Sequence, residues 1–158
     1  MKKEKRQTQG APRSQRTRVL FVCVGNACRS PMAEAIARYD AADVMEASSA
    51  GLYPLGYIAE LTKQTLMKNG YSVNGLTSDL LTREDREAAD VIINMTGRTS
   101  EEVFGGHGGR GKVEDWVVED PYGKDSETYQ RVFEGIRRRV SHLAMSLREK
   151  RVSQRAGR

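Results

Sequence analysis

The chain has 158 residues, of which 38% are hydrophobic, and this size and composition suit one domain with a buried core. Its apolar runs are much shorter than the roughly 20 residues that span a membrane, and its charged N-terminus lacks the apolar region of a secretory signal. Two cysteines are too few for a disulfide framework, so we expect a cytoplasmic protein.

The net charge of +5 comes from the two ends of the chain. Residues 1–18 hold seven Lys or Arg and one Glu, and residues 148–158 hold five and one, whereas residues 19–147 hold 14 basic and 19 acidic residues. Basic, polar ends of this kind are usually solvated, although loose binding of nucleic acid or anionic lipid stays open. Because the body has no stripe of basic and aromatic residues, we expect no specific nucleic-acid binding.

Short apolar runs alternate with amphipathic segments along the body of the chain. In chain order, the pattern predicts a strand over 18–23, a helix over 30–42 with Ser30 as its N-cap, a strand over 44–51, a helix over 58–70, a helix over 82–89 capped by Thr82, a strand over 89–95, a shorter strand over 112–118 and a long helix over 125–150. Residues 71–78 are compatible with a further short strand, and the glycine-rich residues 105–111 are typical of a flexible loop.

Alternation of strands and helices predicts an α/β fold, in which a parallel sheet is covered by helices on both faces. We expect residues 17–150 to form this domain, between a disordered basic arm at 1–16 and a basic tail at 151–158. Parallel sheets bind ligands at the carboxyl ends of their strands, and Cys23 lies at one of these ends.

The segment Cys-Val-Gly-Asn-Ala-Cys-Arg, residues 23–29, connects the first predicted strand to the first predicted helix. Gly25 and Asn26 permit the tight geometry of a loop with consecutive amide N–H groups, and the following helix N-terminus adds partial positive charge. Arg29 adds a planar fork for two phosphate oxygens, so the loop is expected to bind phosphate. The same positive field favours the thiolate form of Cys23, which is then an in-line nucleophile at phosphorus. The alternative for a cysteine at the end of a strand is a simple packing role.

A phosphate ester also needs an acid that protonates its leaving group. The best candidate is Asp120 in Glu-Asp-Pro-Tyr-Gly, residues 119–123, where Pro121 favours an extended backbone at Asp120. Tyr122 is placed to flank a flat substrate. On local evidence alone, the Asp-Pro pair could equally form a turn.

The string Val-Cys-Val-Gly-Asn-Ala-Cys-Arg-Ser-Pro-Met-Ala-Glu, together with Glu-Asp-Pro-Tyr-Gly further along, closely resembles the low-molecular-weight protein tyrosine phosphatases. The resemblance covers roughly residues 17–148 and implies three layers, with a central four-stranded parallel sheet between helices. It implies a reaction without a cofactor, in which Cys23 forms a phosphocysteine and Asp120 acts first as acid and then as base. Arg29 would bind the phosphoryl group, and Ser30 would help the thiolate leave.

The resemblance also assigns supporting roles to other residues. Asn26 and Ser49 would hold the shape of the loop, and Tyr122 and Tyr53 would line the substrate groove. Cys28 matches a second loop cysteine that forms a reversible disulfide with the nucleophile on oxidation, although packing explains it equally well. The residues that would contact phosphate are Val24, Gly25, Asn26, Ala27, Cys28 and Arg29.

The substrate is expected to be a phosphorylated protein, with inorganic phosphate and other oxyanions as inhibitors. Ala27 matches neither the threonine of related arginine phosphatases nor the bulky aliphatic residue of typical tyrosine phosphatases. Asp-Pro-Tyr-Gly directly before a helix resembles the bacterial branch that includes the arginine phosphatases. We expect phosphotyrosine, with phosphoarginine as the alternative and another small phosphorylated substrate behind both.

Three functions of other classes compete with this interpretation. A thioredoxin-coupled arsenate reductase needs two further cysteines, and none follows Cys28. Residues 106–112 match the start of a nucleotide-binding loop, but Val113 stands where Ser or Thr should meet Mg²⁺. A non-catalytic module that binds phosphoproteins is the third, although no catalytic residue is missing. We expect no metal site, because the cysteines form no ligand pattern with His107 and His142.

Overall fold

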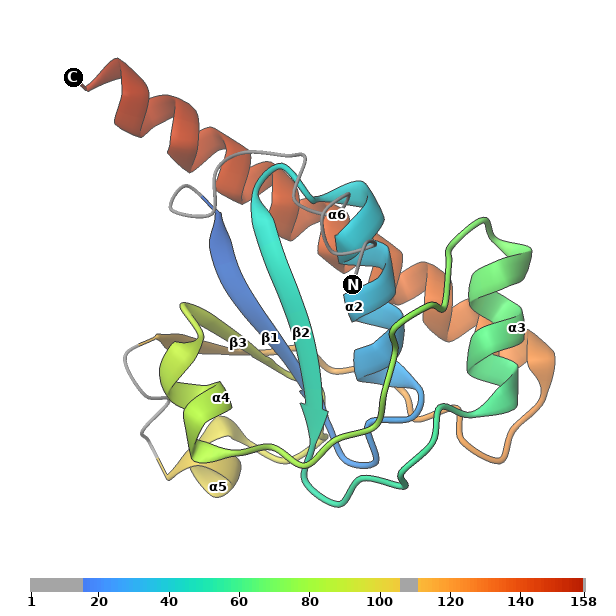
Figure 1. The fold of residues 1–158 in the computed structure, drawn as a ribbon. Helices are drawn as coiled ribbons and strands as arrows, with labels where there is room; N and C mark the ends of the chain where they lie inside the picture. Colours follow the sequence, from blue (N-terminus) through green and yellow to red (C-terminus); the bar gives the residue numbers. More distant parts are fainter. Residues whose placement is uncertain (1–15, 106–110, 158) are drawn as a thin grey trace.

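The computed structural model describes residues 16–105 and 111–157. Within them a four-stranded parallel sheet, in the order β2-β1-β3-β4, lies between two layers of helices (Figure 1). This arrangement confirms the expected three-layer α/β fold. The strands are β1 (Thr17–Cys23), β2 (Met45–Gly51), β3 (Val91–Asn94) and β4 (Lys112–Asp115).

Strand β1 lies in the middle of the sheet, and its residues alternate between the two faces. Val19, Phe21 and Cys23 belong to the core on one face, while Leu20 and Val22 belong to the core on the other. All five side chains are buried. A continuous apolar run is what a strand covered on both faces requires, and this run made β1 recognisable in the sequence.

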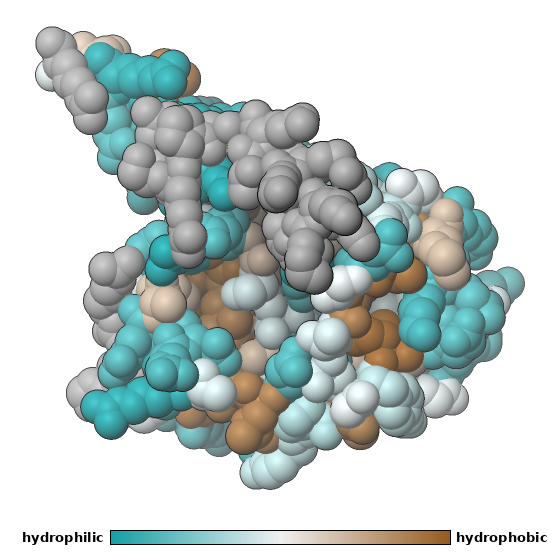
Figure 2. Space-filling model, viewed as in Figure 1, coloured by the Kyte–Doolittle hydropathy of each residue, from teal (hydrophilic) through white to brown (hydrophobic). Residues whose placement is uncertain are grey.

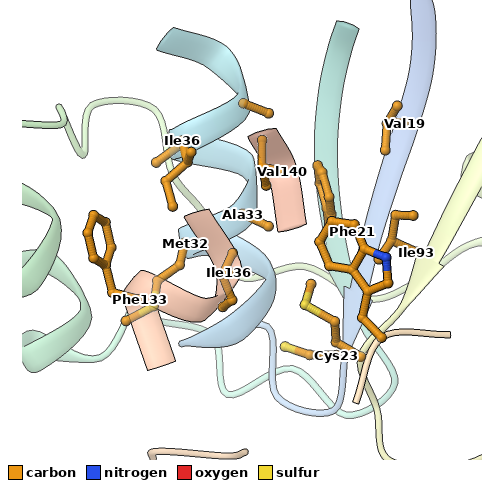
Figure 3. Packing of buried hydrophobic residues seen from close by; sticks show 14 of the residues in the cluster. Val19, Phe21, Cys23, Met32, Ala33, Ile36, Ile93, Phe133, Ile136 and Val140 are labelled. Carbon is orange, nitrogen blue, oxygen red and sulfur yellow. The ribbon is translucent and has the colours of Figure 1, made fainter. Parts of the chain in front are cut away.

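Helices α2 (Arg29–Asp40) and α6 (Ser126–Ala156) cover the first face, with α3 (Glu60–Lys68) packed beside them, and two short helices lie at the second face. α2 packs on β1 and β2, and α6 packs on α2 and on α3. On the second face, α4 (Arg83–Ala88) contacts β1, and α5 (Ser100–Phe104) adds Phe104 to the smaller core. Figure 3 shows the larger core from close by, with Cys23 beyond Val19 and Phe21 along β1, where the core ends.

The long helix α6 presents one apolar stripe to the core. Its buried apolar residues recur at intervals of three and four and include Tyr129, Val132, Phe133, Ile136 and Val140, as the sequence pattern predicted. The helix runs to Ala156, six residues beyond the predicted end at 150, and Figure 1 shows its last turns projecting past the sheet.

Two arginines hold the far part of α6 to the rest of the molecule. Arg148 pairs with Asp43 at 2.8 Å, and Arg151 lies 3.8 Å from the same carboxylate. The hydrogen bond from Arg148 lowers the pKa of Asp43. These contacts attach α6 to the loop between α2 and β2.

Several local predictions need correction. Ser30 is not the N-cap of α2, because the helix begins at Arg29 after Cys28, and Cys28 makes no side-chain capping bond. Residues 71–78 contain no strand, and an isolated bridge joins Gly51 to Leu80 instead.

Helix α5 was not predicted from the sequence. β3 and β4 end earlier than expected, at Asn94 and Asp115.

Other predictions fall wholly or partly outside the described residues. The proposed arm at 1–16 lies there except for residue 16, and so do residues 106–110 of the glycine-rich segment and residue 158 of the tail. The domain boundaries therefore stay predictions. In the part of the chain that the structure describes, no helix is long and apolar enough to cross a membrane. Figure 2 shows polar residues over much of the visible face, with apolar residues in patches between them.

Candidate active site

The segment that follows β2 runs along the outer side of the loop from Cys23 to Arg29 and is hydrogen-bonded to it. Four backbone N–H groups of this segment donate to four loop carbonyls over 2.8 to 3.2 Å: Leu52 to Cys23, Tyr53 to Val24, Leu55 to Gly25, and Ala59 to Ala27. In a trans peptide the N–H group points opposite to the carbonyl before it. The N–H groups that follow these four carbonyls, those of residues 24, 25, 26 and 28, therefore face the inner side of the loop, where they have no acceptor among the described residues. They form a cup for an anion.

Asn26 holds the shape of this cup from inside the protein. Its backbone is left-handed, with φ of 47°, and its side chain is fully buried. The amide nitrogen donates to Ser30 Oγ at 2.7 Å and to Ser49 Oγ at 3.0 Å, and Oδ1 accepts from Asp79 N at 2.8 Å. The structure thus places Ser49 against Asn26. These bonds fix a backbone conformation that a non-glycine residue rarely adopts.

A buried acid extends this network and was not found from the sequence. Ser49 Oγ donates to Glu34 Oε1 at 2.6 Å, and Glu34 also forms an ion pair with Arg38 one turn along α2. Burial raises the pKa of Glu34, while Arg38 and the Ser49 hydroxyl act in the opposite direction. The i, i+4 spacing of Glu34 and Arg38 was a usable signal for the ion pair, but nothing in the pattern indicated that it would be buried.

Gly51 allows β2 to approach the loop closely. The sheet register pairs Gly51 with Cys23. A Cβ atom on Gly51 would lie 2.8 Å from Asn26 Cβ and 2.9 Å from Val24 O. Such distances are too short for any side chain, so the loop can have this shape only with glycine here.

The Cys23 sulfur lies at the floor of the cup. It is 2.9 Å from Ser30 Oγ, and Ser30 N donates to it over 3.5 Å. Because Ser30 Oγ already accepts a hydrogen bond from Asn26, its own hydrogen is free to point to the sulfur. Ser30 therefore serves the nucleophile candidate rather than the helix end.

Arg29 is buried between the cup and the acid candidate. Its Nη1 donates to Met95 O at 2.7 Å and to Val118 O at 3.4 Å, and its Nη2 lies 3.6 Å from Asp120 Oδ2. Its Nε is buried and has no hydrogen-bond partner in the described residues. A buried donor without a partner costs free energy, so this group is ready for an acceptor in the cup.

Asp120 lies on the rim, on the loop between β4 and α6. Its side chain is 55% exposed, and Oδ1 accepts a hydrogen bond from Tyr122 N at 3.1 Å. The Tyr122 hydroxyl lies 2.7 Å from that of Tyr57, and this hydrogen bond raises the pKa of Tyr122. Sequence reasoning missed Tyr57, because no pattern indicated that the two loops meet.

A cavity of about 280 Å³ opens above the sulfur. It brings together candidates that are far apart in the sequence, and it adds Leu55, which was not predicted. Asn26, Ser30 and Ser49 do not line it, and they act on the loop from behind. The lining residues are Cys23, Val24, Gly25, Ala27, Cys28, Arg29, Tyr53, Leu55, Asp120 and Tyr122.

Cys28 lines the same cavity but packs toward α6. Its sulfur lies 3.4 Å from the Tyr129 hydroxyl, and burial raises the pKa of the Cys28 thiol. Both cysteines are free thiols in this structure. Burial keeps Cys28 protonated, so it is a weaker nucleophile than an exposed thiol.

Two other kinds of site, a metal centre and a nucleotide-binding loop, are not supported by the described residues. In the described ranges, no group of three or more His, Cys, Asp or Glu side chains could hold a metal ion. At the glycine-rich segment, Lys112 and Val113 begin strand β4. A nucleotide-binding loop leads into a helix, so the structure does not favour that interpretation.

Comparison with known proteins agrees with this geometry. The chain is 32% identical over 131 residues to a probable low molecular weight protein-tyrosine-phosphatase, EpsP of Ralstonia nicotianae, covering 77% of this chain and 90% of that protein. It is 29% identical over 134 residues to the glutaredoxin arsenate reductase of Synechocystis sp., covering 80% and 95%. The solved YwlE arginine phosphatase from Geobacillus stearothermophilus is similar in fold, with a TM-score of 0.77 at 25% identity, covering 87% and 96%.

The family model of the low molecular weight phosphotyrosine protein phosphatases matches residues 18–153, which include the cup, its supports and the rim acid. Relatives named for three different activities match this chain, so the comparisons show the family rather than one substrate. The chain belongs to the low molecular weight phosphotyrosine protein phosphatase family.

Proposed function

We propose that this protein hydrolyses phosphotyrosine in proteins through a phosphocysteine at Cys23. One observation carries the proposal: the Cys23 sulfur lies at the floor of a cup of inward-facing N–H groups, and the same cavity is lined by Arg29, whose buried Nε has no partner among the described residues. An anion site with a nucleophile at its floor is suited to attack on a bound phosphoryl group.

Binding of the substrate would supply acceptors for the hydrogen-bond donors of the cup that have none in the described residues. The phosphoryl oxygens would accept from the loop N–H groups and from Arg29, with further attraction from the N-terminus of α2. Because a phosphoryl dianion carries more charge than a carboxylate, it would replace Asp120 as the partner of Arg29 Nη2. This exchange would free Asp120 to face the leaving group.

In the first step, a lone pair of Cys23 Sγ forms a bond to phosphorus as the bond from phosphorus to the tyrosine oxygen breaks. Asp120, which takes up a proton from water once the phosphoryl group has displaced it from Arg29, gives that proton to the tyrosine oxygen, so tyrosine leaves as a neutral phenol. Arg29 would contact the reacting group, and its Nη2 lies 3.6 Å from Asp120 Oδ2, which supports a role for Asp120 as the acid at the rim.

In the second step, water attacks the phosphorus of the phosphocysteine, and the Asp120 carboxylate takes its proton. The sulfur–phosphorus bond breaks, and its electron pair returns to Cys23 as a thiolate. The Ser30 hydroxyl, 2.9 Å away, stabilises this thiolate. Every proton and electron pair comes from water, substrate or these side chains, so the proposed reaction uses no cofactor.

The walls of the cavity favour an aromatic substrate. Tyr53, Leu55 and Tyr122 give it flat or apolar sides, and the small side chain of Ala27 leaves room beside the loop. Aromatic rings pack well against such surfaces. Asp120 is the one acid among the lining residues, and a cationic guanidinium would favour more than one.

Phosphoarginine is the second candidate, and two observations favour it. The solved arginine phosphatase superposes with a TM-score of 0.77, and Asp-Pro-Tyr-Gly leads almost directly into α6, as in that branch. Arsenate reduction is less favoured. The chain has no cysteine after Cys28 that could pass a disulfide outward.

The test compares three peptides of one sequence that carry phosphotyrosine, phosphoarginine or phosphoserine. We expect kcat/KM to be highest for phosphotyrosine and lowest for phosphoserine. A higher value for phosphoarginine would replace the proposed substrate and keep the mechanism. Absence of turnover on all three, with a folded protein, would overturn the phosphatase proposal.

A further inference from the structure

Arg98 lies at the mouth of the cavity, outside the set of residues assigned above. Its guanidinium carbon is 6.0 Å from the centre of the Tyr53 ring, and Tyr53 lines the cavity. Both side chains are exposed. A cation over an aromatic face is attracted by the ring electrons, so Arg98 is held near the entrance rather than spread into solvent.

The backbone beneath Arg98 is fixed by a buried network at the end of β3. Asn94 Nδ2 donates to Arg98 O at 2.7 Å, and Asn94 Oδ1 accepts from Thr96 Oγ1 at 2.7 Å. Thr96 Oγ1 also accepts from Arg98 N at 3.0 Å. Asn94 and Thr96 are buried, and Gly97 supplies the positive φ of the turn. This preorganised turn fixes the backbone of Arg98, and therefore the point from which its side chain extends.

Arg98 has no carboxylate partner in the part of the chain that the structure describes. Arg131, by contrast, is also exposed but is paired with Glu119 at 3.1 Å. An arginine left unpaired on a fixed turn beside a substrate cavity is ready to bind a carboxylate through its planar fork.

We propose that Arg98, held over Tyr53, binds an acidic side chain close to the phosphorylated residue of the protein substrate. The inference rests on the proposed function, because the phosphorylated side chain must occupy the cavity. The guanidinium carbon lies 6.0 Å from the centre of the Tyr53 ring, which lines the cavity, and an extended peptide covers a distance of this size in about two residues at 3.3–3.6 Å each. We therefore expect this subsite, formed by Arg98 over Tyr53, to bind an acidic side chain within about two residues of the phosphotyrosine.

The test uses three phosphotyrosine peptides that differ only in carrying Glu, Gln or Lys at the two positions on each side. The variants are Arg98→Gln, Arg98→Glu and Arg155→Glu. Arg155 lies in the last turn of α6, and Figure 1 shows this end far from the loop after β1. Arg155→Glu therefore makes the same charge change away from the site. Dividing each kcat/KM by that variant's own value on p-nitrophenyl phosphate removes any general loss of activity.

The wild-type protein should prefer the Glu peptide over the Lys peptide by about twofold to fivefold, as expected for an exposed ion pair. Arg98→Gln should bring the ratio to about one, Arg98→Glu should reverse it, and Arg155→Glu should leave it at the wild-type value. The wild-type preference should also shrink as NaCl rises from about 0.05 M to about 0.5 M.

Two results would overturn the inference alone: a wild-type ratio near one, or a preference that survives Arg98→Glu. In both cases turnover of the peptides would leave the proposed function standing. Absence of wild-type turnover on every peptide would overturn the proposed function and, with it, the proposed role of Arg98. The variants are expected to fold, because the buried network holds the backbone of Arg98 and not its side chain.

Discussion

The Ser30 hydroxyl oxygen lies 2.9 Å from the Cys23 sulfur and at the same time accepts a hydrogen bond from the side-chain amide of Asn26 over 2.7 Å. Because the oxygen already accepts from Asn26, the hydroxyl hydrogen is free to point to the sulfur once the sulfur is a thiolate. The loop thereby carries a fixed donor for the negative charge that returns to sulfur when phosphate leaves.

Replacement of Ser30 by Ala should therefore slow the second step more than the first. Hydrogen bonds to charged groups contribute about 1.5–3 kcal/mol, so kcat should fall by about tenfold to a hundredfold. Stopped-flow measurement with p-nitrophenyl phosphate should show a burst of p-nitrophenol, because the phosphocysteine accumulates. A slower steady state without a burst would contradict this role.

Replacement of Asp120 by Ala should lower kcat by about 10²–10⁴, as expected on loss of a general acid. The loss should shrink for aryl phosphates whose leaving groups are strong acids, because these need no proton. Rates on a series of substituted phenyl phosphates provide the measurement. An equal loss for all leaving groups would show that Asp120 acts in another way.

Replacement of Gly51 by Ala should damage the loop from outside the cavity. The added Cβ would meet Asn26 Cβ at 2.8 Å, so the free energy of unfolding should fall by about 1–3 kcal/mol and kcat/KM should fall with it. Gly135→Ala is the matched control, because its Cβ would meet nothing closer than Arg138 at 3.9 Å. In the helix it should raise stability by about 0.5–1 kcal/mol. Equal effects of the two substitutions on activity would contradict the account.

The buried Glu34 predicts a pH dependence of stability. Burial raises its pKa in the folded protein above the unfolded value, so its contribution is fully present below the unfolded pKa and is lost as pH rises through the folded pKa. The stability advantage of the wild-type protein over Glu34→Gln should therefore shrink as pH rises from about 5 to about 8. Urea unfolding at several pH values measures it. An advantage that grows with pH would show that the ion pair with Arg38 outweighs burial.

The sequence was most informative where one residue pattern had one structural meaning. The apolar run of β1 predicted a strand buried on both faces, and the glycine and asparagine of the loop predicted its tight geometry. Asp120 lies nearly a hundred positions after Cys23, and its role was inferred from a sequence motif and not from the helix or strand pattern around it. The structure brings it beside Arg29 because both lie at the carboxyl ends of parallel strands.

The sequence was least informative where a contact depends on how two loops or elements pack. Neither the Tyr57–Tyr122 hydrogen bond nor the position of Arg98 over Tyr53 has a sequence signature. Ser30 was misassigned as a cap, because Ser before Pro usually begins a helix, and here its hydroxyl is used on sulfur. Helix α5 did leave a signal, since Thr99 and Glu102 form a capping box.

The central claim is that phosphate passes through the sulfur of Cys23, and the most direct test is the hydrolysis of p-nitrophenyl phosphate by Cys23→Ser, with vanadate binding as the check that the cup is intact. We predict that the variant binds vanadate and shows no turnover. Turnover at a rate near that of the wild-type protein would contradict the account.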